Sequence, residues 1–118
     1  MSDDRLLLRD VLDAIERISE FTSEGEDSFK NDRKTQDAVI RNLEIIGEAT
    51  KGLSHAARAQ HPALPWSDMA GMRDKLIHDY AGVDLNIVWN VVEQELPAVH
   101  DAVSELHTAL EAGDPATE

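Results

Sequence analysis

One short segment of the chain, from Arg73 to Tyr80, combines residue types that could act on a phosphate ester. His78 can give or take a proton near neutral pH, because the unperturbed pKa of an imidazole is about 6.5. The guanidinium of Arg73 is permanently charged, and its forked donors suit the oxygens of a phosphate group. Taken alone the pair is a weak signal, since a helical arginine and histidine are more often solvated or ion-paired.

The spacing within this segment sets where the side chains would lie on a helix. Each residue turns by about 100°, so Arg73 and Tyr80 fall within roughly 20° of each other. Asp74 lies one turn before His78, where its carboxylate could orient the imidazole and raise its pKa. Arg73 and His78 are roughly 140° apart, which seats them poorly around one phosphate. Either the helix ends by Ile77, or two copies of the segment meet across a dimer axis and supply two histidines; we favour the second.

Capping residues and loop composition predict the first two helices. An aspartate at position 3 or 4 should cap a helix that runs to about Phe21, and residues 22–27 are typical of a loop. A second helix should begin near residues 32–35 and end at 52–54. These two long helices should form the centre of the fold.

The segment with Arg73 and His78 should belong to the third helix. A short helical turn should reach His61, and the two prolines after it exclude helix. Ser67 is the predicted N-cap of the third helix, which should reach His78 or Tyr80. A break over residues 81–83 should follow.

Asp84 should cap a fourth helix, and Pro97 should either kink it or begin a new one. Trp66 and Trp89 are expected as core anchors, and the other four histidines, at 55, 61, 100 and 107, show no metal-ligand spacing. Apolar residues recur at helical steps and predict one buried stripe on each long helix. The stripes are Leu7, Val11, Ile15 and Ile18; Val39, Leu43, Ile46, Thr50 and Leu53; Leu85, Val88, Trp89 and Val92; and Val99, Val103, Leu106 and Leu110.

Composition and charge exclude several classes of protein. With 42% hydrophobic and 30% charged residues, the 118-residue chain is expected to fold as one globular domain over residues 1–112, with a disordered tail at 113–118. There is no cysteine, no apolar run long enough to span a bilayer and no start typical of a signal peptide, so a cytoplasmic protein is expected. No metalloprotease, di-iron or P-loop motif is present, and neither a metal nor a cofactor is expected.

The formal net charge of −13 is distributed unevenly along the chain. Residues 1–50 carry a net charge of −6 and residues 79–118 carry −9, whereas residues 51–78 carry +2. An acidic protein does not coat nucleic acid through diffuse electrostatics, but a small basic site remains compatible with this distribution. The acidic surface serves either solubility or a basic partner.

The order R-x-x-x-x-H-x-Y in residues 73–80 resembles the signature of the HepT-like toxins of the HEPN superfamily. The likeness covers about residues 5–107 in order and without a large gap, so the flanks make the signal specific. At position 81 the family most often has an aromatic residue, whereas this chain has Ala81. Further segments similar to the family are residues 38–49 (AVIRNLEIIGEA), Pro65-Trp66, residues 70–73, residues 82–84, Val88-Trp89 and Leu96-Pro97.

The resemblance implies an all-α, HEPN-like four-helix bundle with an additional short helix, assembled as a homodimer or a higher oligomer. It also implies a metal-independent endoribonuclease toxin with Arg73 and His78 as catalytic residues. Asp74 would support them, Lys75 is a candidate RNA contact, and Tyr80 would be a supporting residue as well as the position of modification. The implied partner is an MntA-type minimal nucleotidyltransferase antitoxin, which silences such toxins by attaching AMP to the motif tyrosine.

RNA carries its own nucleophile, the 2′-hydroxyl, so the protein needs only a base, an acid and positive charge near the phosphate. His78 can supply the first two functions and Arg73 the third. The expected substrate is therefore RNA, with transfer RNA as one candidate. The alternative is a non-catalytic dimeric HEPN interaction module that binds a nucleotidyltransferase, and the acidic residues 79–118 favour it over RNA affinity.

Overall fold

The computed structural model describes residues 3–78 and 82–112, and of residues 73–78 it describes the backbone alone. Within these ranges every regular element is helical, so the predicted all-α fold class is confirmed. The predicted tail at 113–118 lies outside the described residues. The elements are α1 (Asp4–Phe21), α2 (Glu26–Lys30), α3 (Arg33–Lys51), α4 (His55–Ala59), α5 (Trp66–His78), α6 (Leu85–Asn90), η2 (Val91–Glu95) and α7 (Leu96–Ala112).

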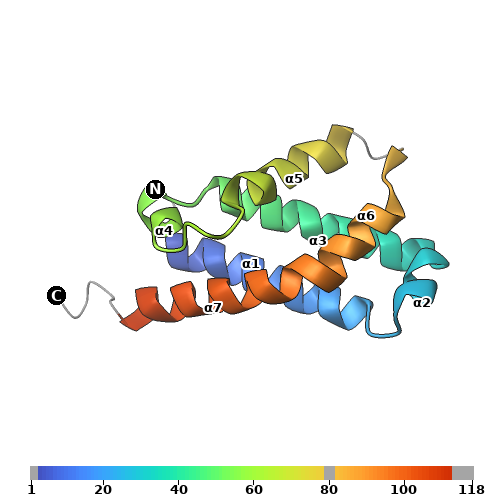
Figure 1. The fold of residues 1–118 in the computed structure, drawn as a ribbon, viewed down its shortest axis with the longest axis horizontal. Helices are drawn as coiled ribbons and strands as arrows, with labels where there is room; N and C mark the ends of the chain where they lie inside the picture. Colours follow the sequence, from blue (N-terminus) through green and yellow to red (C-terminus); the bar gives the residue numbers. More distant parts are fainter. Residues whose placement is uncertain (1–2, 79–81, 113–118) are drawn as a thin grey trace.

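Three long helices form the body of the molecule (Figure 1). α1 lies between α3 and α7 and runs antiparallel to both, while α5 packs along the other side of α3 (Figure 1). The fully buried side chains come mainly from α1, α3 and α7: Leu8, Val11, Ile18, Val39, Leu43, Ile46, Val103 and Leu106. None of the helices in the described ranges is long and apolar enough to cross a membrane.

α1 begins as predicted, because the Asp3 side chain accepts a hydrogen bond from the Arg5 amide at 3.0 Å. Val11, Ile15 and Ile18 of the predicted stripe are buried, but Leu7 is only partly covered, whereas Leu8 is fully buried. Leu7 differs because α1 is packed on two sides and Leu7 lies at the edge toward the end of α3. A Cβ built on Gly52 would lie only 3.0 Å from the Leu7 Cδ1 atom, so glycine permits this close approach.

The predicted loop at residues 22–27 is too long, because Glu26 and Asp27 already belong to α2. Gly25 has a φ of 95°, a backbone conformation that favours glycine, and it redirects the chain into the new helix. Phe29 is 1% exposed, so the single turn of α2 is held by burial of one aromatic side chain. The acidic composition of this stretch is typical of a loop, so the helical turn was not predicted.

α3 begins after Asp32, whose carboxylate accepts a hydrogen bond from the Lys34 amide at 3.0 Å. The predicted stripe is confirmed, since Val39, Leu43, Ile46 and Thr50 are buried in α3 and Leu53 is buried just after its end. α3 ends at Lys51, and α4 follows as the predicted short helical turn. Arg58 of α4 donates from Nη2 to the Thr50 carbonyl at 2.8 Å, which satisfies one of the free carbonyls at the end of α3.

α6, η2 and α7 follow one another without a loop. Asp84 caps α6 as predicted, accepting a hydrogen bond from the Asn86 amide at 2.8 Å. The five residues of η2 form a π-helical turn that ends immediately before Leu96, and Pro97 is the second residue of α7. Proline lacks an amide hydrogen and crowds the preceding turn, so Pro97 begins a new helix after this irregular turn.

Candidate active site

α5 carries the predicted catalytic segment at its carboxyl end. The helix begins at Trp66, one residue before the predicted cap at Ser67, because the Pro65 carbonyl already accepts from the Met69 amide at 2.9 Å. Proline suits this boundary, since its fixed φ and missing amide are tolerated where the helix starts. The predicted cap is therefore wrong by two residues, and the predicted helix is confirmed as far as His78, the last residue described before the gap.

The backbone of α5 places Arg73 and His78 on one continuous helix. Five positions on a helix separate two side-chain directions by roughly 140°, so both groups cannot converge on one phosphate from the same face. The alternative in which the helix ends by Ile77 does not match this backbone. Arrangement of the motif across two copies of the chain remains a prediction.

The contacts of the predicted site residues lie outside the described part of the chain. This holds for the side chains of Arg73, Asp74, Lys75 and His78 and for the whole of Tyr80. Their roles stay predictions, whereas the elements that hold them are described. Among the described residues, no group of three histidine, aspartate or glutamate side chains could hold a metal ion.

The start of α5 is anchored by Trp66, which is 7% exposed. Its indole Nε1 donates to the Arg58 carbonyl at 3.0 Å and to the His61 carbonyl at 2.8 Å. Met69, one turn further along, is also buried. These contacts fix the proline-containing loop and the first turn of α5, on which the direction of the whole helix depends.

The chain that follows the predicted site is held by α2. Lys30 donates to the Glu26 carboxylate at 2.6 Å and also to the Asn86 side chain at the start of α6. Trp89 of α6 packs against Phe29 with ring centroids 5.5 Å apart, so both tryptophans are core residues as predicted. No sequence pattern indicates this role of Lys30, because its partner Asn86 is 56 positions away in the chain.

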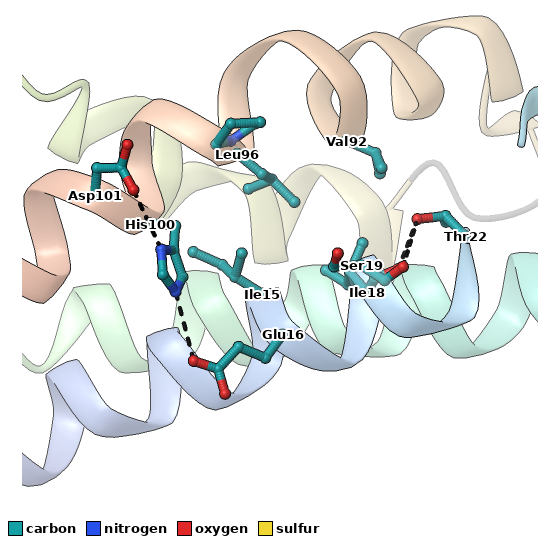
Figure 2. Close-up of a pocket in the computed structure, with 10 residues that line it drawn as sticks. Ile15, Glu16, Ile18, Ser19, Thr22, Val92, Leu96, His100 and Asp101 are labelled. Carbon is teal, nitrogen blue, oxygen red and sulfur yellow. Dashed lines mark hydrogen bonds and ion pairs between the residues drawn. The ribbon is translucent and has the colours of Figure 1, made fainter.

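A hollow lies between α1 and α7 (Figure 2). His100 lies on its rim and contacts Glu16 of α1 and Asp101 of α7 (Figure 2). A second histidine of α7, His107, lies 3.0 Å from the Glu111 carboxylate. Sequence spacing gave no sign of the hollow, since its two walls are about 80 positions apart in the chain.

Comparison with known families identifies the one to which this chain is similar. Residues 11–106 match the family described as "Ribonuclease HepT-like". The chain belongs to this family. The predicted family and the predicted enzyme class, ribonuclease, are therefore confirmed.

Curated relatives agree with the family match. A Thermococcus cleftensis protein named "Probable ribonuclease HepT" is 48% identical over 100 residues, which cover 84% of this chain and 91% of the relative. A Methanocaldococcus jannaschii protein named "Putative RNase MJ0127" is 41% identical, over 95% and 93% of the two chains. The "mRNA nuclease HepT" of Shewanella oneidensis is 30% identical, over 70% and 79%. No solved structure gives a significant match.

Proposed function

We propose that this HepT-like chain is a metal-independent endoribonuclease toxin that cleaves RNA with Arg73 and His78 at a site shared by two copies of the chain. The observation that carries the proposal is the continuous helix through His78, which holds both residues on one element but on different faces. Relatives named as ribonucleases support the substrate class, and one of them is named as an mRNA nuclease. Transfer RNA and messenger RNA are both candidate substrates in the cytoplasm.

The proposed reaction needs no nucleophile from the protein. The 2′-oxygen attacks the adjacent phosphorus, the bond from phosphorus to the 5′-oxygen breaks, and the products are a 2′,3′-cyclic phosphate and a 5′-hydroxyl end. His78 of one copy takes the proton from the 2′-hydroxyl, and His78 of the second copy gives a proton to the leaving 5′-oxygen. Arg73 stabilises the extra negative charge on the phosphorane oxygens.

The dimer follows from the helix geometry. A two-fold axis beside the end of α5 would bring Arg73 of one copy toward His78 of the other, whereas the separation of roughly 140° disfavours such an approach within one copy. Asp74, one turn before His78, would orient the imidazole and stabilise its charged form. Lys75 is the proposed additional contact to the RNA backbone.

Control is proposed to act through Tyr80. An MntA-type nucleotidyltransferase would attach AMP to its hydroxyl, two positions after His78 and near the direction of Arg73 on an extended helix. The added phosphate would compete with the RNA phosphate for the guanidinium, and the nucleoside would occupy the space of the substrate. The toxin and the antitoxin would then form one regulated pair.

The experiment that tests the proposal compares His78→Ala with His55→Ala, a matched substitution at an exposed histidine of α4. In EDTA, His78→Ala should lower RNA cleavage by at least about 100-fold, because a general acid–base residue contributes roughly that much or more. His55→Ala should cleave like the unmodified protein. Equal activity of the two variants would contradict the assignment of His78.

The same assay separates the enzyme from the competing function, a dimeric interaction module that binds a nucleotidyltransferase. The acidic chain after the motif favours the module, since residues 82–112 contain no lysine or arginine. No cleavage of any RNA by unmodified protein would support the module. Activity that survives chelation supports the metal-free ribonuclease.

A further inference from the structure

The hollow between α1 and α7 has the composition of a docking site. It encloses about 340 Å³, at the small end of the range for binding pockets. Its apolar wall combines Ile15 and Ile18 of α1 with Val92 of η2 and Leu96 of α7 (Figure 2). η2 forms one end of this wall, so the π-helical turn before Pro97 shapes the opening.

Two carboxylates stand on the rim of this hollow, on either side of His100 (Figure 2). The imidazole Nε2 lies 3.4 Å from Oε2 of Glu16, and Nδ1 lies 3.5 Å from Oδ1 of Asp101. The carboxylate side chains are 60% and 86% exposed, and each contact is long for a hydrogen bond. Both carboxylates therefore remain accessible to a stronger cationic partner.

We propose that this hollow is the docking site for a basic amphipathic helix of a partner protein. An apolar side chain of that helix would lie against Val92 and Pro97, which line the hollow and are not fully buried, and an arginine would bind Glu16 and Asp101 at the rim. A guanidinium presents several donors in one plane and can serve two carboxylates at once, which an imidazole does less well. The inference does not depend on the proposed function, because none of the described residues that line the hollow belongs to the 73–80 segment.

Charge favours a basic helix over RNA or a second copy of this chain as the occupant of the hollow. RNA is a poor fit, since the rim carries two carboxylates and the described residues from 82 to 112 include no lysine or arginine. A second copy of this chain, docked by the same face about a two-fold axis, would bring like charges together. Arg9 of α1 lies toward the other end of the contact between α1 and α7. It is paired with Asp13 at 3.3 Å, which largely balances its positive charge.

The test uses a synthetic helical peptide with leucines along one face and arginines beside them, and a control peptide with glutamate at each arginine. Binding to the full chain is measured by fluorescence anisotropy. The basic peptide should bind and the acidic peptide should not. In Glu16→Gln/Asp101→Asn the dissociation constant should rise by about tenfold, because two exposed ion pairs are lost.

A matched control distinguishes the hollow from the general acidity of the protein. Asp10→Asn/Glu24→Gln removes the same charge at two exposed positions outside the hollow and should change the dissociation constant by less than about twofold. Equal losses in the two double variants would overturn the proposal, since they would show binding through net charge alone.

The shape of the hollow is tested without any change in charge. Ser19 is exposed and lines the hollow, so Ser19→Trp should fill it and abolish binding of the basic peptide. Ser28→Trp places the same side chain on the exposed surface of α2 and should bind normally. Far-UV circular dichroism should be unchanged in both variants. Unimpaired binding by a folded Ser19→Trp variant would overturn the proposal.

Discussion

Asp4, the first residue of α1, holds Ser54 with both of its carboxylate oxygens. Oδ1 accepts from the Ser54 amide at 3.0 Å, and Oδ2 accepts from the Ser54 hydroxyl at 2.6 Å. The same hydroxyl oxygen accepts from the Ala57 amide at 3.1 Å and so caps α4. The beginning of the chain thus fixes the turn between α3 and α4, from which the chain continues toward α5.

These hydrogen bonds predict an energetic coupling between Asp4 and Ser54, which are 50 positions apart in the chain. Asp4→Ala and Ser54→Ala should each lower the free energy of unfolding. The double variant should be more stable than the sum of the single losses predicts, by about 0.5–1.5 kcal/mol, the usual value of a hydrogen bond. Urea denaturation of the four proteins measures the coupling, and additive losses would show that the two side chains act independently.

The cap of α3 predicts a measurable dependence on pH. The Thr35 hydroxyl donates to Asp32 at 2.9 Å, and with the Thr35 and Lys34 amides it lowers the pKa of Asp32 below 3.8. A lowered pKa in the folded state contributes stability above the unfolded value, and this stability is lost as the pH falls through the folded value. The stability difference between the unmodified protein and Asp32→Asn should therefore shrink in acid.

Thr35→Val provides the control for this interpretation. It removes the largest cause of the shift, so NMR titration should find the pKa of Asp32 closer to 3.8 in this variant. An unchanged pKa would assign the shift to the backbone amides of the helix start instead.

The two buried tryptophans should respond differently to the same substitution. Trp66 donates from Nε1 to two carbonyls, whereas the buried Nε1 of Trp89 has no hydrogen-bond partner among the residues that the structure describes. Both Trp→Phe changes lose packing, but only the change at Trp66 also removes hydrogen bonds. Trp66→Phe should therefore cost about 1–2 kcal/mol more in free energy of unfolding, measured in urea. Equal costs would show that the Trp66 hydrogen bonds contribute no net stability.

The sequence predicted those parts of the fold that depend on neighbouring residues. Asp3, Asp32 and Asp84 each cap the helix they were expected to begin, because capping needs only a side-chain oxygen and an amide two or three positions later. α2 was missed, since its single turn depends on burial of Phe29 against Trp89. The contact between Asp4 and Ser54 was equally invisible, because no local pattern marks it.

The sequence predicted which helix carries the candidate site, but not which groups its residues contact. The spacing of residues 73–80 and their flanks indicated the family, and the family match confirmed it. The sequence also placed Arg73 and His78 on one helix, and α5 runs through both positions. The partners of Arg73 and His78 were not predictable in this way, because the proposed arrangement needs a second copy of the chain, and a helical pattern describes one copy only.

Tyr80 should accept AMP when the protein is incubated with ATP and an MntA-type nucleotidyltransferase. The mass of the chain should increase by about 329 Da for each AMP group, and peptide mapping should place the increase on Tyr80. Cleavage of RNA should fall in parallel, because the added phosphate competes for Arg73. Tyr80→Phe should cleave RNA but resist silencing. Modification of another residue, or normal silencing of Tyr80→Phe, would require a different route of control.

Mixed dimers test whether the site is shared between two copies of the chain. His78→Ala should be inactive alone. After unfolding and refolding with an equal amount of unmodified chain, about half of the dimers should contain one copy of each. If one phosphate needs His78 from both copies, these mixed dimers are inactive and only the dimers of two unmodified copies cleave RNA, so the activity should fall to about a quarter of that of the unmodified protein. A site contained within one copy would keep half of its intact sites, and a residual activity of about one half would therefore contradict the shared site.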